Sequence, residues 1–162
     1  MNKILSIAFL LMILVCNTVF ASSQPEQDTK QLLTKFTEAR FKLESGVSYH
    51  DFQDIKQGLY VATKMYSENY PDGEFNGKFD NILTIYTDTA SLWGLKISSP
   101  DIFLFGAGSI CKGYIEKYPD VMAKYQEPGN KYLMGNVISG LYTKIADKTK
   151  ELNQSIKDKY PQ

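Results

Sequence analysis

One stretch of the sequence, residues 72–80, has the composition of a calcium-binding loop. Loops of the EF-hand type place oxygen ligands at positions 1, 3, 5, 7 and 9, a glycine at position 6 and a bidentate glutamate at position 12. The matching residues are Asp72, Glu74, Asn76, Gly77 and Asp80. Position 12 of such a loop would be Leu83. Without the bidentate carboxylate only a weak calcium site is conceivable, and the alternative is a polar loop in which Asn76 caps the next helix.

The second candidate for chemistry is a cysteine–histidine pair. Beyond residue 21, Cys111 is the only cysteine and His50 the only histidine. A catalytic pair needs both side chains within hydrogen-bond reach and a third group that orients the base. His50 falls in the first turn of a predicted helix, where a solvent-facing residue is expected. Cys111 falls within an apolar stretch, where a buried, inert thiol is usual, and an intermolecular disulfide would require it at the surface.

Signatures of other catalytic or metal sites are missing from the sequence. It contains no glycine-rich phosphate loop after a strand, no serine nucleophile elbow and no HExxH motif. One cysteine and one histidine do not make a structural zinc site by themselves. The carboxylates fall on predicted polar faces, as in solvated helices. We therefore predict no catalytic residue, no cofactor and no metal, and a secreted enzyme of unknown type is the third function considered.

Four aromatic residues could line an apolar pocket. They are Trp93, Phe103, Phe105 and Tyr114. Glycines at positions 106 and 108 would leave space beside them for a small apolar ligand. A carrier of such a ligand is the second function considered. Packing in a helical core explains the same residues without a ligand.

The first residues of the chain have the pattern of a secretory signal peptide. Lys3 supplies a positive charge, and residues 4–15 form an uncharged run that is apolar except at Ser6. A small-residue cleavage pattern ends at Ala21, so we expect the mature chain to begin at Ser22. The apolar run is too short for a membrane span. The sequence therefore predicts a signal peptide over residues 1–21, one domain over residues 22–162, and no stable membrane anchor.

The charge balance of the mature chain argues against nucleic acid as a partner. Removal of Lys3 leaves 17 basic residues and 18 acidic residues, a net charge near −1. No basic excess remains to attract phosphate groups. The eleven tyrosines all lie beyond residue 21, and amphipathic aromatics in that number suit helix packing and protein recognition.

The remaining sequence predicts amphipathic helices joined by short turns. Apolar residues recur at three- and four-residue spacing over residues 25–46, 48–69, 76–94 and 132–157, and a short helix follows position 118. Ser48 and Asp51 have the spacing of a capping box. The buried stripe expected for residues 48–69 consists of Phe52, Ile55, Leu59, Ala62 and Met65. Short connections favour antiparallel neighbours, so we expect an all-α, single-domain, up-and-down helical bundle of four to six helices.

Residues 98–118 are expected to form the buried central helix of this bundle. Between positions 100 and 115 they carry only two charged residues, and apolar positions would cover nearly the whole circumference of a helix. Ser99 and Pro100 suit the first positions of a helix. Glycines at positions 106, 108 and 113 suggest that neighbouring elements approach the backbone closely.

Two motifs connect the sequence with known proteins. Gly46-Val47-Ser48-Tyr49-x-x-Phe52, followed by Tyr86-x-x-x-Ala90-x-x-Trp93, resembles a group of small exported bacterial helical proteins of unknown function. The resemblance covers roughly residues 30–95. It implies a helical fold and export, and it lends no activity.

Together these observations favour a non-enzymatic exported protein that acts by binding another protein. In a bacterium it would be a periplasmic binder or inhibitor, or a secreted factor. The expected location is the periplasm or the extracellular medium, because the signal peptide directs passage through one membrane only.

Overall fold

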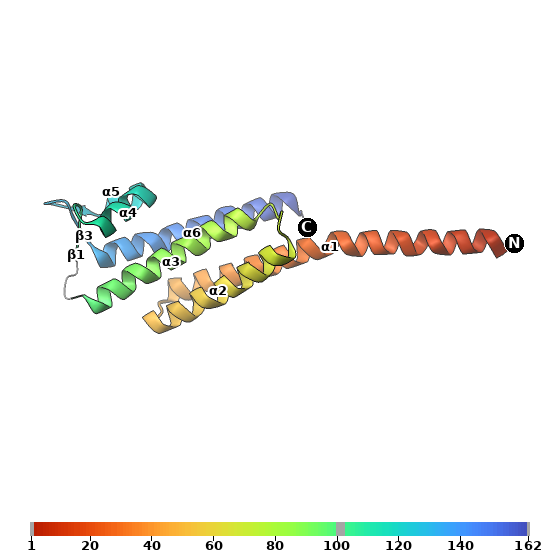
Figure 1. Cartoon of the computed structure of the whole chain (residues 1–162), viewed down its shortest axis with the longest axis horizontal. Helices are drawn as coiled ribbons and strands as arrows, with labels where there is room; N and C mark the ends of the chain where they lie inside the picture. The colour runs from red at the N-terminus through yellow and green to blue at the C-terminus, as the bar shows by residue number, and fades with distance from the viewer. Residues whose placement is uncertain (1, 100–102, 162) are drawn as a thin grey trace.

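The computed structural model describes residues 2–99 and 103–161, with side chains described from Gln24 onward. Four long helices form an up-and-down bundle, which confirms the predicted all-α fold (Figure 1). They are α1 (Asn2–Ser45), α2 (Tyr49–Asn69), α3 (Asn76–Ser98) and α6 (Met134–Lys159). Helices α1 and α3 each pack against both α2 and α6. Each long helix therefore contacts two of the others around a shared core.

A small subdomain is inserted between α3 and α6 at one end of the bundle (Figure 1). It contains β1 (Phe103–Phe105), α4 (Ser109–Lys117), α5 (Pro119–Lys124), β2 (Gln126–Glu127) and β3 (Lys131–Leu133). The strands form an antiparallel sheet in the order β1-β3-β2, with Leu104 opposite Tyr132 and Gln126 also opposite Tyr132. With α4 and α5, the described residues contain six helices, within the predicted four to six.

The prediction of a buried central helix over residues 98–118 is wrong. Residues 100–102 lie outside the described residues, Phe103–Phe105 form β1, and α4 begins only at Ser109. A short apolar run by itself is compatible with a helix or a strand. Residues 103–105 form a strand because they pair with β3. The close backbone approach expected at the glycines does occur at Gly106: its N–H donates to the carbonyl of Asn130, and a Cβ there would collide with the Asn130 side chain.

Asp88 on α3 holds the inserted subdomain against the bundle. Its carboxylate accepts hydrogen bonds from the hydroxyl of Tyr118 at 2.7 Å and from the ammonium of Lys117 at 3.1 Å. Its backbone carbonyl accepts a hydrogen bond from the hydroxyl of Tyr114 at 2.6 Å. Lys144 on α6 pairs with Asp120 of α5 at 2.7 Å. Polar contacts from both neighbouring helices therefore position α4 and α5.

Helix α1 continues without a break through position 25, where the sequence pattern predicted its start. The side chains before Gln24 lie outside the described residues, so the signal peptide over residues 1–21 stays a prediction. Where side chains are described, no helix is both long and apolar enough to pass through a membrane.

Aromatic rings from three helices meet in the centre of the bundle. Phe52 of α2 is fully buried, and its ring centroid lies 5.7 Å from Tyr86, 5.6 Å from Trp93 and 5.7 Å from Tyr142. On α3 the apolar residues at three- and four-residue spacing from Phe79 to Ala90 are buried. Buried residues recur in the same way along α6, at Ile138, Leu141, Ile145, Leu152 and Ile156. Three- and four-residue spacing thus identified most of the core correctly.

The turn between α1 and α2 has the predicted capping geometry. Gly46 adopts a φ of +88°, which favours glycine, and ends α1. The hydroxyl of Ser48 accepts from the backbone N–H of Asp51 at 3.1 Å, and the backbone N–H of Ser48 donates to the Asp51 carboxylate at 3.3 Å. This reciprocal pair is a capping box, which fixes where α2 begins.

Replacing Ser48 by alanine is expected to lower the free energy of unfolding by about 1 kcal/mol, because the backbone N–H of Asp51 loses its acceptor. Urea denaturation of the wild type and the variant measures this difference. Ser91→Ala is the control, because Ser91 is an exposed serine in the interior of α3. Equal losses in the two variants would contradict a special role for the cap.

Candidate functional site

A long groove lies on the outer face of the bundle between α1 and α2. Two open cavities of about 630 and 610 Å³ form it, the first near the α1–α2 turn and the second towards the end of α2. Lys35, Asp54 and Gly58 line both cavities, so the two adjoin. We call this surface the α1–α2 groove; its walls are residues 28–45 of α1 and 51–69 of α2.

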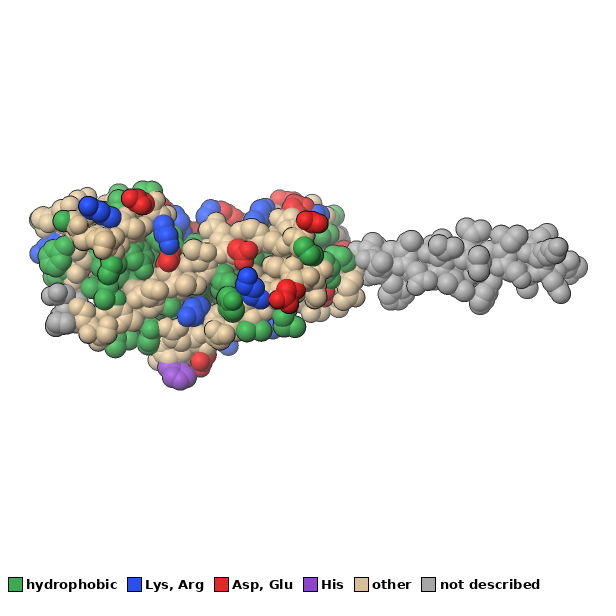
Figure 2. All heavy atoms as spheres, in the orientation of Figure 1, with side chains coloured by type: hydrophobic (Ala, Val, Ile, Leu, Met, Phe, Trp, Pro, Cys, Tyr) green, Lys and Arg blue, Asp and Glu red, His purple; other side chains and the backbone are tan. Residues whose placement is uncertain are grey.

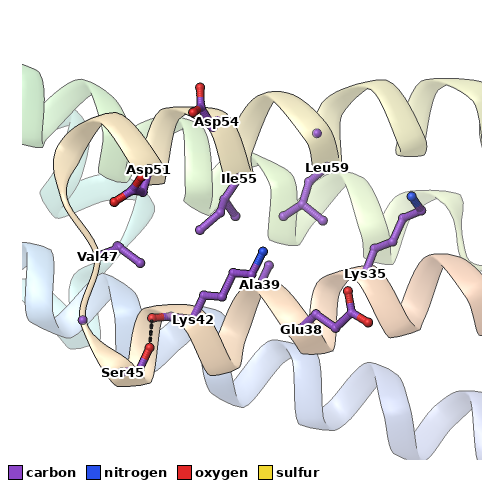
Figure 3. A pocket seen from close by; sticks show the side chains of 12 residues that line it. Lys35, Glu38, Ala39, Lys42, Ser45, Val47, Asp51, Asp54, Ile55 and Leu59 are labelled. Atoms are coloured by element: carbon purple, nitrogen blue, oxygen red, sulfur yellow. Dashed lines mark hydrogen bonds between the residues drawn. The ribbon is translucent and has the colours of Figure 1, made fainter.

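The apolar side chains of the groove come mainly from α2. Figure 3 shows Ile55 and Leu59 projecting from α2 into the space between the two helices. Farther along α2, Val61 and Met65 line the groove and remain 47 % and 60 % exposed. The prediction that Met65 belongs to the buried stripe is therefore wrong. The apolar surface of α2 is wider than the surface that its neighbours α1 and α3 cover.

The hollow centre of the groove coincides with a glycine. Gly58 lies in the third turn of α2, and a Cβ built on it would meet no atom within 4 Å. Glycine in a helix interior costs about 1 kcal/mol relative to alanine. Neither a positive φ nor a close neighbour requires glycine at this position. The absence of a side chain at Gly58 leaves the space above the α2 backbone open where the two cavities adjoin.

Carboxylates outnumber lysines along the groove. They are Asp28, Glu38, Asp51 and Asp54, against Lys35 and Lys42. Hydrogen bonds from the side chain and backbone of Ser48 lower the pKa of Asp51, so this carboxylate is ionised at neutral pH. Asp54 lies 3.2 Å from the imidazole of His50. Neither Lys35 nor Lys42 takes part in an ion pair among the described residues.

Trp93, one of the four residues predicted to line an apolar pocket, is half-buried and packs against the aromatic cluster of the bundle. Its ring contacts Tyr49 at 5.6 Å and Tyr142 at 6.1 Å, in addition to Phe52. Rings from α2 and α6 thus contact Trp93. The aromatic residues of the two sequence motifs at positions 46–52 and 86–93, which are Tyr49, Phe52, Tyr86 and Trp93, meet in this cluster. Their spacing therefore reflects packing.

The other three residues of that prediction lie in the inserted subdomain. Phe103 is half-buried beneath the ammonium of Lys131, 4.6 Å from the ring centre. Phe105 is 55 % exposed. Tyr114 is buried, and its ring centroid lies 6.1 Å from that of Tyr118. Its hydroxyl donates a hydrogen bond to the backbone carbonyl of Asp88 on α3. The structure thus distributes the four residues among different environments, and their role as ligand-binding residues stays a prediction.

Cys111 and His50 lie in contrasting environments. Cys111 is 1 % exposed, and burial raises the pKa of its thiol, which disfavours the reactive thiolate. His50 projects from the first turn of α2, exposed as expected, and is drawn in purple at the surface in Figure 2. The side-chain contact of His50 is with Asp54. The buried thiol matches the expectation for an inert cysteine.

The possible calcium loop has a structural role in the turn between α2 and α3. The side-chain amide of Asn76 donates to the carbonyls of Tyr70 and Pro71 at 2.7 and 3.1 Å, so it does not cap α3 as proposed. Glu74 pairs with Lys159, and Asp80 lies within α3. Across the described residues, no group of three or more His, Cys, Asp or Glu side chains is placed to hold a metal ion.

Sequence reasoning missed the α1–α2 groove. One signal was present: the apolar positions Ile55, Ala62 and Met65, together with Val61, make the stripe of α2 broad for a helix with one buried face. Gly58 in the middle of that helix was a second signal. Comparison of the chain with models of protein families, with characterised proteins and with solved structures gave no match.

Proposed function

We infer that the protein is exported and acts, without catalysis, by binding another protein through the α1–α2 groove. The observation that carries this inference is the open groove with Val61 and Met65 exposed along one wall. Grooves between helices commonly receive an amphipathic helix, whose apolar side chains at three- and four-residue spacing enter the groove. The binding element of the partner is therefore an α-helix with one apolar face.

The export part of the inference rests on the signal-peptide pattern of residues 1–21. Cleavage after Ala21 would leave Pro25 in the first turn of the mature α1. Proline is tolerated there, because the first N–H groups of a helix have no partner within the helix. Cleavage would thus move Pro25 from the interior of α1 to its first turn, which supports cleavage at the predicted position. The mature chain acts in the periplasm or in the medium.

The groove is tested by comparing two variants of exposed residues on α2. Met65 lines the groove, whereas Tyr60 is exposed on the same helix outside it. We expect Met65→Glu to reduce recovery of the bound partner about tenfold or more, because the apolar contact is replaced by a charge. Tyr60→Glu should retain the partner.

The measurement is affinity purification of each variant from separated periplasm and culture medium of the native organism, with a cytosolic marker to exclude lysis. The partner retained by the wild type is identified, purified and titrated against each variant. Equal affinity of the wild type and Met65→Glu would contradict the groove as the docking surface. Retention of the chain in the cytosol would contradict export.

A further inference from the structure

We propose that the helix received by the α1–α2 groove is cationic and amphipathic, and that it places a bulky apolar side chain over Gly58. This inference rests on the proposed function, since it names the chemistry of the partner at the same surface. Charge, shape and length of the groove each contribute to it.

The charge of the groove favours basic side chains on the partner. The residues that line the two cavities include four carboxylates and two lysines, an excess of two negative charges, in a mature chain whose net charge is only about −1. The carboxylates lie on both walls: Asp28 and Glu38 on α1, and Asp51 and Asp54 on α2. A helix with basic residues flanking its apolar face would meet them on either side. A helix with acidic flanks would place like charges together.

The shape of the groove favours a large apolar side chain at its centre. Gly58 lines both cavities and the space above it is open, with Lys35 on the opposite wall. Leu59, Val61 and Ala62 follow on α2 and make one side of this space apolar. A Leu or Phe side chain of the partner would occupy the space and remove apolar surface from water. The long stem of Lys35 would cover it while the ammonium stays solvated.

The length of the groove sets the length of the helix. The lining residues of α1 extend from Asp28 to Ser45, which corresponds to about 26 Å at 1.5 Å per residue. A helix of about 18 residues covers this distance. A helical peptide of that length is therefore a suitable probe.

The test titrates the purified protein with two synthetic peptides of about 18 residues. Both carry leucines at amphipathic helical spacing; one has lysine at every polar position and the other has glutamate. We expect the lysine peptide to bind at least about tenfold more tightly at low salt, and the difference to shrink as salt screens the charges. Isothermal calorimetry measures both affinities.

Gly58→Leu locates the binding. The substitution fills the open space and improves helix propensity, so the variant is expected to keep its helical content and its Tm. We expect it to weaken lysine-peptide binding at least about tenfold. Gly113→Leu is the matched control, because a Cβ at this helical glycine of α4 also meets nothing within 4 Å. It should bind as the wild type does.

The outcomes separate this inference from the proposed function. If both peptides bind equally and Gly58→Leu blocks both, the groove stands and the cationic partner is wrong. If Gly58→Leu leaves lysine-peptide binding unchanged, the peptide binds elsewhere and both proposals are overturned. If light scattering shows a dimer that Gly58→Leu converts to a monomer, the occupant is a second copy of the chain and the cationic helix is overturned. Failure of the lysine peptide to bind overturns it as well.

Discussion

Replacing Phe52 by alanine is expected to lower the free energy of unfolding by about 3–5 kcal/mol. Phe52 is fully buried, and its ring contacts Tyr86 of α3, Trp93 of α3 and Tyr142 of α6. Truncation removes these contacts and leaves a cavity that three helices line. Since domains of this size are stable by about 5–15 kcal/mol in total, the loss would be a large fraction of the stability.

Phe41→Ala is the matched control for this prediction. Phe41 is a phenylalanine of α1 with 56 % of its surface exposed, beneath the guanidinium of Arg40. Its truncation should cost within about 1 kcal/mol, because little apolar surface returns to water. Urea denaturation followed by far-UV circular dichroism gives both values. Similar losses for the two variants would contradict the central position of the Phe52 cluster.

The second large effect expected is cooperative unfolding at alkaline pH. Burial raises the pKa of Tyr86, Tyr114 and Tyr142, and burial together with the hydrogen bond to Asp88 raises that of Tyr118. The hydrogen bond that Tyr70 donates to Asp28 raises the pKa of Tyr70 to about 12. All five phenols therefore keep their protons in the folded chain at a pH where an unfolded chain, with tyrosine pKa values near 10, loses them.

The sign of the pH effect follows from these raised values. Below about pH 10 the tyrosines are neutral in both states, and their contribution to stability is fully present. Above this pH the unfolded chain releases protons that the folded chain retains, so stability falls as the pH rises towards about 12 and beyond. We expect circular dichroism to lose its helical signal in this range, together with the appearance of tyrosinate absorbance.

A single tyrosine variant checks the alkaline prediction. Tyr70→Phe removes one of the phenols with a raised pKa, so stability should depend less steeply on pH above pH 10. Tyr60→Phe, at an exposed position on α2, is the control. Tyrosinate formation that precedes the loss of helix, with no change in stability, would contradict the coupling between these groups and the fold.

The sequence predicted the bundle because each long helix has its own repeating apolar pattern. The inward residues of α1, α3 and α6 and the capping box at Ser48 depend on local spacing, which can be read without tertiary information. The inserted subdomain could not be read in this way. Phe103–Phe105 becomes a strand only because β3, about 28 residues later in the chain, pairs with it.

The candidate site was not predicted for a different reason. Successive three-residue steps fall short of a full turn, so an apolar stripe that uses them drifts around the helix and away from the core. The two steps from Leu59 through Ala62 to Met65 rotate the side chain by about 120° around α2. Leu59 is accordingly buried, and Met65 is exposed in the groove.

The most direct test of the docking groove is cross-linking from inside it in the native organism. A photoreactive side chain at position 65 would report the groove, and the same side chain at position 60 would report the exposed surface beside it. The proposed function predicts that position 65 joins a helical segment of one partner protein and that position 60 does not. Equal yields from the two positions, or no product from position 65 under conditions that preserve the complex, would contradict the α1–α2 groove as the binding surface.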